Sequence, residues 1–183
     1  MSQKYKAREQ YKPYFVTVTV THWIDLFTRE EYRQVILDSL LFCQKQKGLI
    51  VHAWVIMSNH LHLIVSSESN SIPNIMRDFK KFTSVSLVRA IAEHPQESRR
   101  EWLLRGFAAK AEASAKHQKY QIWQEGYHPI DLFDAERLGQ RLKYLHENPV
   151  RAGWVWKPED YRYSSAMVYY TGMVDERLPL VLL

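Results

Sequence analysis

The sequence predicts an α+β fold, a four-stranded antiparallel sheet with its helices on one face. The chain has 183 residues, of which 46% are hydrophobic and 13% aromatic, which suits one domain with a sizeable core over residues 1–183. Its patterns follow the order strand, helix, strand, strand, helix, strand, and a further helix comes last. The first six elements have the order of the split βαβ unit, so we expect a ferredoxin-like sheet with an additional C-terminal helix.

Two segments open this order. Residues 13–22 alternate threonine with β-branched or aromatic side chains, which is the pattern of a half-buried strand. A helix is expected over residues 28–47, because Thr28 and Glu31 have the spacing of a capping box and Gly48 supplies a left-handed stop.

The middle of the chain predicts a hairpin and a second helix. Residues 49–65 are too apolar and β-branched for a surface helix and are interrupted only by Ser58 and Asn59, so we expect two strands joined by a tight turn. Ser71 is a candidate N-cap for the next helix. The expected buried face of that helix consists of Ile72, Ile75, Met76, Phe79 and Phe82.

The last third contains a helical excursion, a strand and the final helix. Residues 95–118 are charged and rich in alanine, and we interpret them as a helical insertion. Residues 120–124 are expected to form the fourth strand. Asp134 caps a helix with a leucine stripe, and Asn148 followed by Pro149 is expected to end it, because the residue before proline avoids the helical region.

Composition limits the kinds of function. The single cysteine excludes an internal disulfide framework and a multi-cysteine zinc site, so any metal must be held by His, Asp, Glu or Asn. The N-terminal segment is charged, and no later stretch approaches the ~18 consecutive apolar residues of a membrane span, so we expect a cytoplasmic protein with no membrane partner. Ten basic and five acidic residues lie between Arg77 and Lys119, which makes this segment a candidate for facing phosphates.

His60 and His62 form the first candidate site. They lie in the second strand of the hairpin, where side chains alternate between faces, so both imidazoles project from one face while Leu61 and Leu63 point to the other. Two imidazoles suit several divalent transition metals and leave positions open for substrate oxygens. On spacing alone, a pair of half-exposed strand histidines is the alternative interpretation.

The last helix carries a second candidate site. Arg137, Arg141, Tyr144 and Asn148 follow one another at helical spacing, on a stripe away from the leucine face. A tyrosine hydroxyl ordinarily has a pKa near ~10, so its use as a nucleophile requires a cation or a metal-bound centre nearby. A surface tyrosine and an ordinary helix-end asparagine are the alternative interpretation of this stripe.

Four segments, in this order, carry the most specific signal: Trp54–Val65, Trp123–His128, Tyr144–Gly153 and Tyr163–Ala166. They contain the sequences Ser-Asn-His-Leu-His, Trp-Gln-Glu-Gly-Tyr-His, Tyr-Leu-His-Glu-Asn-Pro and Tyr-Ser-Ser-Ala. In combination they resemble the single-tyrosine HUH transposases, and among these the REP-associated tyrosine transposases. The resemblance covers most of the chain.

The resemblance implies a metal-dependent endonuclease and strand transferase for single-stranded DNA, usually dimeric, that recognises imperfect hairpins. His60 and His62 match the metal-binding pair, and Tyr144 matches the nucleophile, which leaves a 5′-phosphotyrosine and a free 3′-hydroxyl. Asn148 stands where related insertion-sequence transposases have a glutamine as the third ligand. The expected cation is Mg²⁺ or Mn²⁺, a homodimer is expected, and no nucleotide cofactor is implied.

The expected DNA contacts are basic side chains on the second predicted helix and on or just after the helix that carries Tyr144. They are Arg77, Lys80, Lys81, Arg141, Lys143 and Arg151. The aromatic cluster of Trp154, Trp156, Tyr161 and Tyr163 offers possible base-stacking platforms.

Three alternative functions remain open at this point. The first is a non-catalytic single-stranded nucleic-acid-binding module on the same architecture, although the RNP1 pattern of RRM domains is absent and histidines occupy the central strand. The second is a metal-dependent hydrolase that activates water, with Tyr144 structural. The third is a binder that has lost catalysis, and the sequence also leaves open whether Tyr144 serves the histidines of its own subunit or of a partner.

Overall fold

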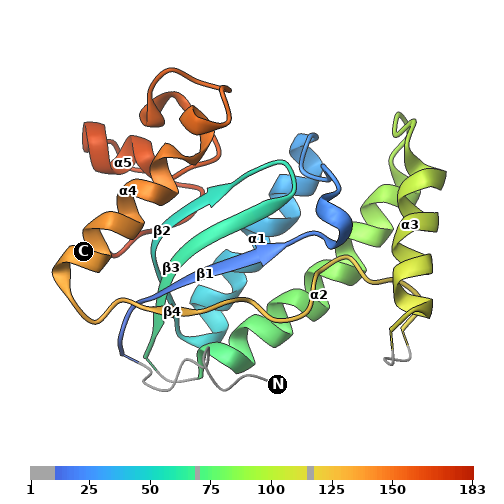
Figure 1. The fold of residues 1–183 in the computed structure, drawn as a ribbon, viewed down its shortest axis with the longest axis horizontal. Helices are drawn as coiled ribbons and strands as arrows, with labels where there is room; N and C mark the ends of the chain where they lie inside the picture. The colour runs from blue at the N-terminus through green and yellow to red at the C-terminus, as the bar shows by residue number, and fades with distance from the viewer. Residues whose placement is uncertain (1–10, 69–70, 115–117) are drawn as a thin grey trace.

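The computed structural model describes residues 11–68, 71–114 and 118–183, and its centre is a four-stranded sheet. The strands are β1 (Tyr14–Thr19), β2 (Leu49–Ile56), β3 (His60–Ser67) and β4 (Ile130–Asp131). They lie in the order β2-β3-β1-β4, and every neighbouring pair is antiparallel (Figure 1). This is the strand order of a ferredoxin-like sheet, so the predicted fold class is confirmed.

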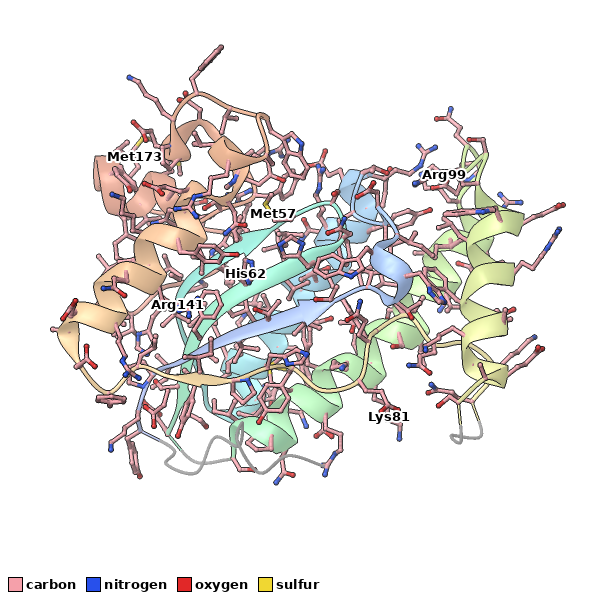
Figure 2. The ribbon with its side chains drawn as sticks, in the orientation of Figure 1. Met57, His62, Lys81, Arg99, Arg141 and Met173 are labelled. Atoms are coloured by element: carbon pink, nitrogen blue, oxygen red, sulfur yellow. The ribbon has the colours of Figure 1, made fainter. Side chains whose placement is uncertain are left out.

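Helices lie on both sides of this sheet. The helices are α1 (Glu30–Lys47), α2 (Ile72–Glu93), α3 (Arg100–Glu112), α4 (Ala135–Arg151) and α5 (Ala166–Thr171), with short 3-10 turns at η1 (Thr21–Trp23) and η2 (Pro158–Asp160). α1 and α2 pack against each other on one face, and α3 stands beside α2 at the edge of the molecule (Figure 1). α4 crosses β2 and β3 on the other face, where His62 and Arg141 lie close together (Figure 2). The predicted additional helix that carries Tyr144 is therefore α4, and it covers the face of the sheet opposite α1 and α2.

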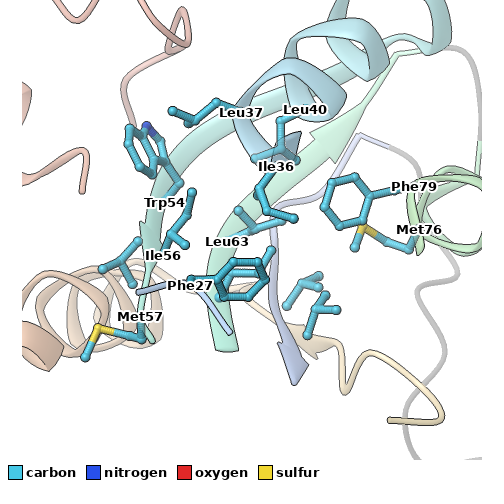
Figure 3. Packing of buried hydrophobic residues seen from close by; sticks show 14 of the residues in the cluster. Phe27, Ile36, Leu37, Leu40, Trp54, Ile56, Met57, Leu63, Met76 and Phe79 are labelled. Carbon is cyan, nitrogen blue, oxygen red and sulfur yellow. The ribbon is translucent and has the colours of Figure 1, made fainter. Parts of the chain in front are cut away.

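The core lies between the sheet and the pair α1 and α2. Leu63 of β3 packs among Ile36 and Leu40 of α1 and Phe79 of α2, all fully or almost fully buried (Figure 3). Burying a side chain of this size stabilises the fold by about 1.5–3 kcal/mol. Because Leu61 and Leu63 point into this core, His60 and His62 project from the opposite face, as predicted.

Local signals at several helix ends are confirmed. Gly48 adopts the left-handed conformation with φ 67° and ends α1. The Ser71 side chain accepts a hydrogen bond from the Asn74 amide at 3.4 Å, and the Asp134 carboxylate accepts one from the Arg137 amide at 2.7 Å, so both are N-caps.

The fourth strand was predicted in the wrong place. Residues 120–124 make only an isolated bridge, Val20 to Trp123, and the paired strand is Ile130–Asp131 further along the chain. The reason is that β1 ends at Thr19 and the chain turns away over η1, so residues 120–124 have no continuous strand to pair with. The first strand is shorter than the predicted residues 13–22 for the same reason.

Two expectations about the first two helices are also wrong. The capping box of Thr28 and Glu31 does not form: Arg29 is the N-cap of α1 without a side-chain bond, and the Thr28 hydroxyl accepts a hydrogen bond from Arg99 at 3.0 Å instead. Phe82 is 62% exposed, because the buried stripe of α2 continues through Thr83 rather than through Phe82.

Pro149 does not end α4, the helix that carries Tyr144. α4 continues to Arg151, and the chain then closes with hydrogen bonds from the Ala152 amide to Asn148 and from the Gly153 amide to Val150, both at 2.9 Å. Proline costs most in a helix interior, where it removes a main-chain bond. Here only two helical residues follow it, so the backbone tolerates the missing donor.

Two remaining expectations concern a membrane span and segments outside the described residues. Over the residues that the structure describes, no helix is both long and apolar enough to cross a membrane. The charged N-terminal segment and residues 115–117 of the predicted excursion lie outside the described residues.

Candidate functional site

His60 and His62 lie side by side on β3. Their ring centroids are 4.7 Å apart, with the rings at 69° to each other. The register places His62 opposite Thr17 of β1 and opposite Val55 of β2, near the centre of the sheet. The sheet thus holds both imidazoles on a rigid backbone, on the face that α4 covers.

His62 is the more buried of the pair, with 5% of its surface exposed. Its Nδ1 lies 2.9 Å from the Thr17 hydroxyl, and its Nε2 is buried without a hydrogen-bond partner among the described residues. Burial, with the positive charge of neighbouring His60 and Arg141, lowers the pKa of His62 to about 3. His62 is therefore neutral, and its lone pair at Nε2 is available to a ligand when Nδ1 carries the proton.

His60 is held by the residue before it. Its Nδ1 lies 2.7 Å from the side-chain oxygen of Asn59. Burial lowers the pKa of His60 as well, so both imidazoles are in the neutral form that binds metal. The orphaned Nε2 of His62 and the chemistry of two neighbouring imidazoles fit a divalent cation.

Tyr144 of α4 reaches this pair of histidines from above the sheet. Its ring lies 5.4 Å from that of His62 and 6.0 Å from that of Phe15, centroid to centroid. The guanidinium groups of Arg151 and Arg141 lie 5.3 and 5.9 Å from the centroid of the Tyr144 ring. Two cations thus flank the phenol and favour negative charge on or near it.

Asn148 lies one helical turn beyond Tyr144. Its side-chain nitrogen donates to the main-chain carbonyl of Tyr144 at 2.7 Å, and within the described residues no hydrogen bond joins it to His60 or His62. Over the same part of the chain, no cluster of three or more His, Cys, Asp or Glu side chains has the arrangement of a metal site. Asn148 as a third ligand therefore stays a prediction.

A buried polar network that sequence reasoning missed holds α4 on the sheet. His146 of α4 places its Nε2 2.9 Å from the Ser165 hydroxyl, which lies 2.9 Å from the main-chain nitrogen and 3.2 Å from the oxygen of Trp54 in β2. The adjacent Ser164 forms an isolated bridge with Val55. The Tyr-Ser-Ser-Ala segment therefore joins the tyrosine helix to the strand beside the histidines. In the sequence this segment contributes only to the family resemblance, which does not predict its contact with His146.

Two of the predicted DNA contacts flank this site and a third lies at its rim. Arg141 lies against Phe15 and Tyr144, and Arg151 against Tyr144. Lys143 is more exposed and pairs with Glu147 at 3.6 Å, while Arg151 pairs with the same carboxylate at 2.9 Å. Of the two cations in the predicted stripe, Arg141 thus lies at Tyr144. Arg137 instead lies against Phe133 and pairs with Asp134 at 3.3 Å.

The other predicted contacts lie away from the histidines, on α2. Arg77, Lys80 and Lys81 line a pocket of about 650 Å³ between α2 and residues 118–127, and Lys81 is found at the edge of the molecule (Figure 2). The Lys80 ammonium donates to the main-chain oxygens of Gln124 and Gly126 at 2.5 Å, so it fastens this segment to α2. The structure does not bring these three residues together with the site of Tyr144.

The long basic segment is largely engaged with the protein itself. Arg99 bonds to Glu97 and to the Thr28 hydroxyl, and Arg89 pairs with Glu93 at 2.9 Å. Figure 2 places Arg99 beside the N-terminal end of α3, far from His62. An excess of charge along the sequence therefore does not by itself mark a phosphate-binding surface.

Comparison with solved structures gives similar folds. A REP-associated tyrosine transposase bound to a REP hairpin superposes with a TM-score of 0.65 at 16% sequence identity, over 100% of this chain and 94% of the other. A candidate transposase from Deinococcus radiodurans R1 gives a TM-score of 0.47 at 14% identity, over 80% of this chain and 97% of the other. The search of curated proteins returned no match.

The sequence itself matches a family model. Residues 9–117 match the model described as "Transposase IS200 like". The match spans more than half of the chain and includes His60 and His62, whereas Tyr144 lies beyond it. The chain therefore belongs to the IS200-like transposase family and is a transposase, an enzyme class that cleaves DNA and transfers the strand.

Proposed function

We propose that this protein is a metal-dependent endonuclease and strand transferase for single-stranded DNA, in which Tyr144 is the nucleophile. The observation that carries the proposal is the contact between Tyr144 and His62 of the same chain, 5.4 Å between ring centroids. The Tyr144 oxygen attacks the scissile phosphorus as it loses its proton, and the bond from phosphorus to the 3′-oxygen breaks. The 3′-oxygen takes up a proton, which leaves a 5′-phosphotyrosine and a free 3′-hydroxyl.

The protein's own groups have defined roles in this step. His60 and His62 are the proposed ligands for the cation, with Asn148 as the third. Mg²⁺ or Mn²⁺, when bound, would polarise the scissile phosphate and stabilise its developing charge. The guanidinium groups of Arg141 and Arg151 both lie near the phenol ring and favour the negative charge of the attacking oxygen.

The covalent intermediate explains how the strand is transferred. A phosphotyrosine keeps the free energy of the phosphodiester bond, so the 3′-hydroxyl of a second strand can reverse the step without a nucleotide cofactor. Asn148 limits the motion of the helix end by bonding to the Tyr144 carbonyl, and the His146–Ser165 network holds the same helix against β2. Both contacts hold the helical turn that follows the nucleophile.

The DNA partner is proposed to be a single strand that carries an imperfect hairpin. The solved structure with the same fold is a complex with a REP hairpin, which supports this choice. Arg141, Lys143 and Arg151 are the proposed contacts near the cleaved phosphate, and Arg77, Lys80 and Lys81 the contacts further along the strand. Of these side chains, Lys80 is expected to contribute least to DNA binding, because its ammonium already donates to two main-chain oxygens.

Three further expectations stay predictions alongside this proposal: a homodimer, a cytoplasmic location, and residues 95–118 as an insertion into a single domain. The contact of Tyr144 with its own His62 means that a second subunit is not needed to bring these two side chains together.

The test is incubation with a 3′-labelled single-stranded hairpin and Mn²⁺, followed by denaturing electrophoresis. A covalent adduct that is absent from Tyr144→Phe supports the proposal. Cleavage that survives in Tyr144→Phe would favour a water-activating hydrolase, and tight binding without any cleavage would favour a non-catalytic binder.

A further inference from the structure

Three side chains form a hydrogen-bonded chain that ends on His60. One carboxylate oxygen of Asp25, Oδ1, lies 2.9 Å from the side-chain nitrogen of Asn59, and it also accepts a bond from the Ser58 hydroxyl at 2.5 Å. The side-chain oxygen of Asn59 lies 2.7 Å from Nδ1 of His60. The backbone supports this arrangement, because the Phe27 amide donates to Ser58 at 2.7 Å and the Val20 amide to Asn59 at 2.8 Å.

The chemistry of these groups determines where the proton of His60 lies. An ionised carboxylate only accepts hydrogen bonds, so the Asn59 amide must turn its nitrogen toward Asp25. Its oxygen then faces His60, and an amide oxygen also only accepts. His60 must therefore carry its proton on Nδ1, which leaves the lone pair on Nε2.

His62 has no such constraint. Its Nδ1 meets the Thr17 hydroxyl at 2.9 Å, and a hydroxyl both donates and accepts, so either tautomer of His62 satisfies this bond. The two histidines therefore differ: the protein imposes the tautomer of His60 and permits that of His62.

We propose that Asp25 is a positioning residue that acts through Asn59 to hold His60 in the tautomer with a free Nε2. Outer partners of a metal-binding histidine fix its tautomer and the direction of its ring, and here the outer partner of His60 is itself fixed by a carboxylate. The proposal rests on the proposed function in so far as His60 is a metal ligand. The tautomer itself is a property of the metal-free protein.

The experiment is nitrogen-15 NMR of the histidine rings in the metal-free protein, combined with Mn²⁺ titration. Wild-type His60 is expected to give the signature of a proton on Nδ1. In Asp25→Asn the new amide presents either its oxygen or its nitrogen, so His60 should become a mixture of tautomers and Mn²⁺ affinity should fall about tenfold. Asn59→Ala should show the same change in the His60 signature.

Asp38→Asn is the matched control. Asp38 also accepts a hydrogen bond from a side-chain amide, that of Gln34 at 2.7 Å, but it lies on α1 away from the histidines. It should leave the His60 spectrum and Mn²⁺ affinity at wild-type values. A wild-type His60 protonated on Nε2, or an Asp25→Asn spectrum identical to wild type, would overturn the inference. If the tautomer behaves as expected but the wild type binds no Mn²⁺, the positioning holds and the metal role of His60 fails.

A different observation concerns Trp23, which stands beside His60 at the edge of the site. Its side chain is 59% exposed, and its ring lies 5.8 Å from that of His60 at an angle of 72°. Both Trp23 and the preceding His22 have φ 55°, in the left-handed region. Bulky residues rarely adopt this conformation, and such strain clusters at functional sites.

We infer that Trp23 is a stacking platform for one base of the single strand, next to the phosphate held at His60. Single-stranded nucleic acids are bound by aromatic rings combined with positive charge, and an exposed indole beside a phosphate site provides such a ring. This inference also rests on the proposed function, because it assumes a DNA strand at the histidines. It assigns a base-contacting role to a residue outside the C-terminal aromatic cluster.

The test is the affinity for a fluorescein-labelled single-stranded oligonucleotide, measured by anisotropy without metal. Trp23→Ala is expected to weaken binding about tenfold, whereas Trp23→Phe, which keeps a ring, should retain most of it. Phe42→Ala is the control, because Phe42 is 55% exposed and lies on α1, on the face of the sheet opposite the histidines. Equal affinity of Trp23→Ala and wild type would overturn the stacking role of Trp23 but leave the proposed function standing. A wild type that binds no single-stranded DNA would overturn both the stacking role and the proposed function.

Discussion

The ring of Tyr144 packs against the ring of His62 in the same chain, with centroids 5.4 Å apart and the rings at 60°. Tyr144 comes from α4 and His62 from β3, two elements separated by residues 68–134 of the chain. One subunit therefore brings the proposed nucleophile and the proposed metal ligand together. Arg141, one turn before the tyrosine, contributes to the low pKa of His62 and also lies against the Tyr144 ring.

This contact predicts that subunits do not complement one another. A mixture of Tyr144→Phe and His62→Ala proteins should cleave hairpin DNA no better than the sum of the two variants measured separately, because neither chain contains both groups. The measurement is cleavage after the two proteins have been unfolded and refolded together. Recovery of a substantial part of wild-type activity would show instead that Tyr144 acts on the histidines of a partner.

The Thr17 hydroxyl is predicted to matter for turnover more than for DNA affinity. Among the described residues, the Thr17 hydroxyl is the hydrogen-bond partner of His62, 2.9 Å from its Nδ1. Thr17→Val removes this bond and should therefore loosen the orientation of the imidazole. Loss of such an outer partner typically costs about 10- to 100-fold in metal affinity or activity. Thr17→Ser, which keeps the hydroxyl, should behave nearly as wild type, and equal activity of the valine and serine variants would contradict the prediction.

Ser165 is predicted to support the stability of the whole site. Ser165→Ala leaves the His146 ring nitrogen and the Trp54 main-chain nitrogen short of a buried partner, which should cost about 1–3 kcal/mol in the free energy of unfolding. Urea denaturation followed by circular dichroism measures this change. Ser86→Ala, at a half-buried position on α2, serves as the control and should change stability by less than about 0.5 kcal/mol.

Glu97 is predicted to make the fold sensitive to acid. Burial raises its pKa, but hydrogen bonds from Arg99, Tyr32 and Arg29 outweigh this and lower the pKa from 4.5 to about 2. Because the folded protein binds this proton less readily than the unfolded chain, ionised Glu97 stabilises the fold above pH 4.5. That contribution is lost as the pH falls from 4.5 toward 2.

The matching variant is Glu97→Gln. It should be less stable than wild type at neutral pH, and the difference should shrink as the pH is lowered through this range. Urea unfolding at a series of pH values provides the test. If the difference in unfolding free energy between wild type and Glu97→Gln stays constant with pH, the carboxylate charge does not stabilise the contact between α1 and the segment before α3.

The fold and the central residues of the site were predictable because they depend on local periodicity. Alternation along a strand places His60 and His62 on one face, and helical spacing places Arg141 beside Tyr144. The position of β4 could not be predicted, because a strand of two residues paired at the edge of the sheet leaves almost no pattern in the sequence. Strand 120–124 was a reasonable expectation that failed when β1 turned away at η1.

The interactions that hold the site together were hidden for a different reason. The Thr17–His62 bond joins residues 45 positions apart, and the Asp25–Asn59 bond joins residues 34 apart. The ion pair of Arg29 with Glu97 spans 68 positions. Such partners depend on tertiary packing, and no spacing rule within one element reveals them.

The most direct measurement is identification of the amino acid that is joined to DNA. The protein is incubated with a single-stranded hairpin and Mn²⁺, the adduct is digested with nuclease and protease, and the modified peptide is sequenced by mass spectrometry. We expect a nucleotide 5′-phosphate on Tyr144, and no adduct in Tyr144→Phe. Modification of a different residue, or unmodified Tyr144 in a protein that still cleaves the hairpin, would contradict this expectation.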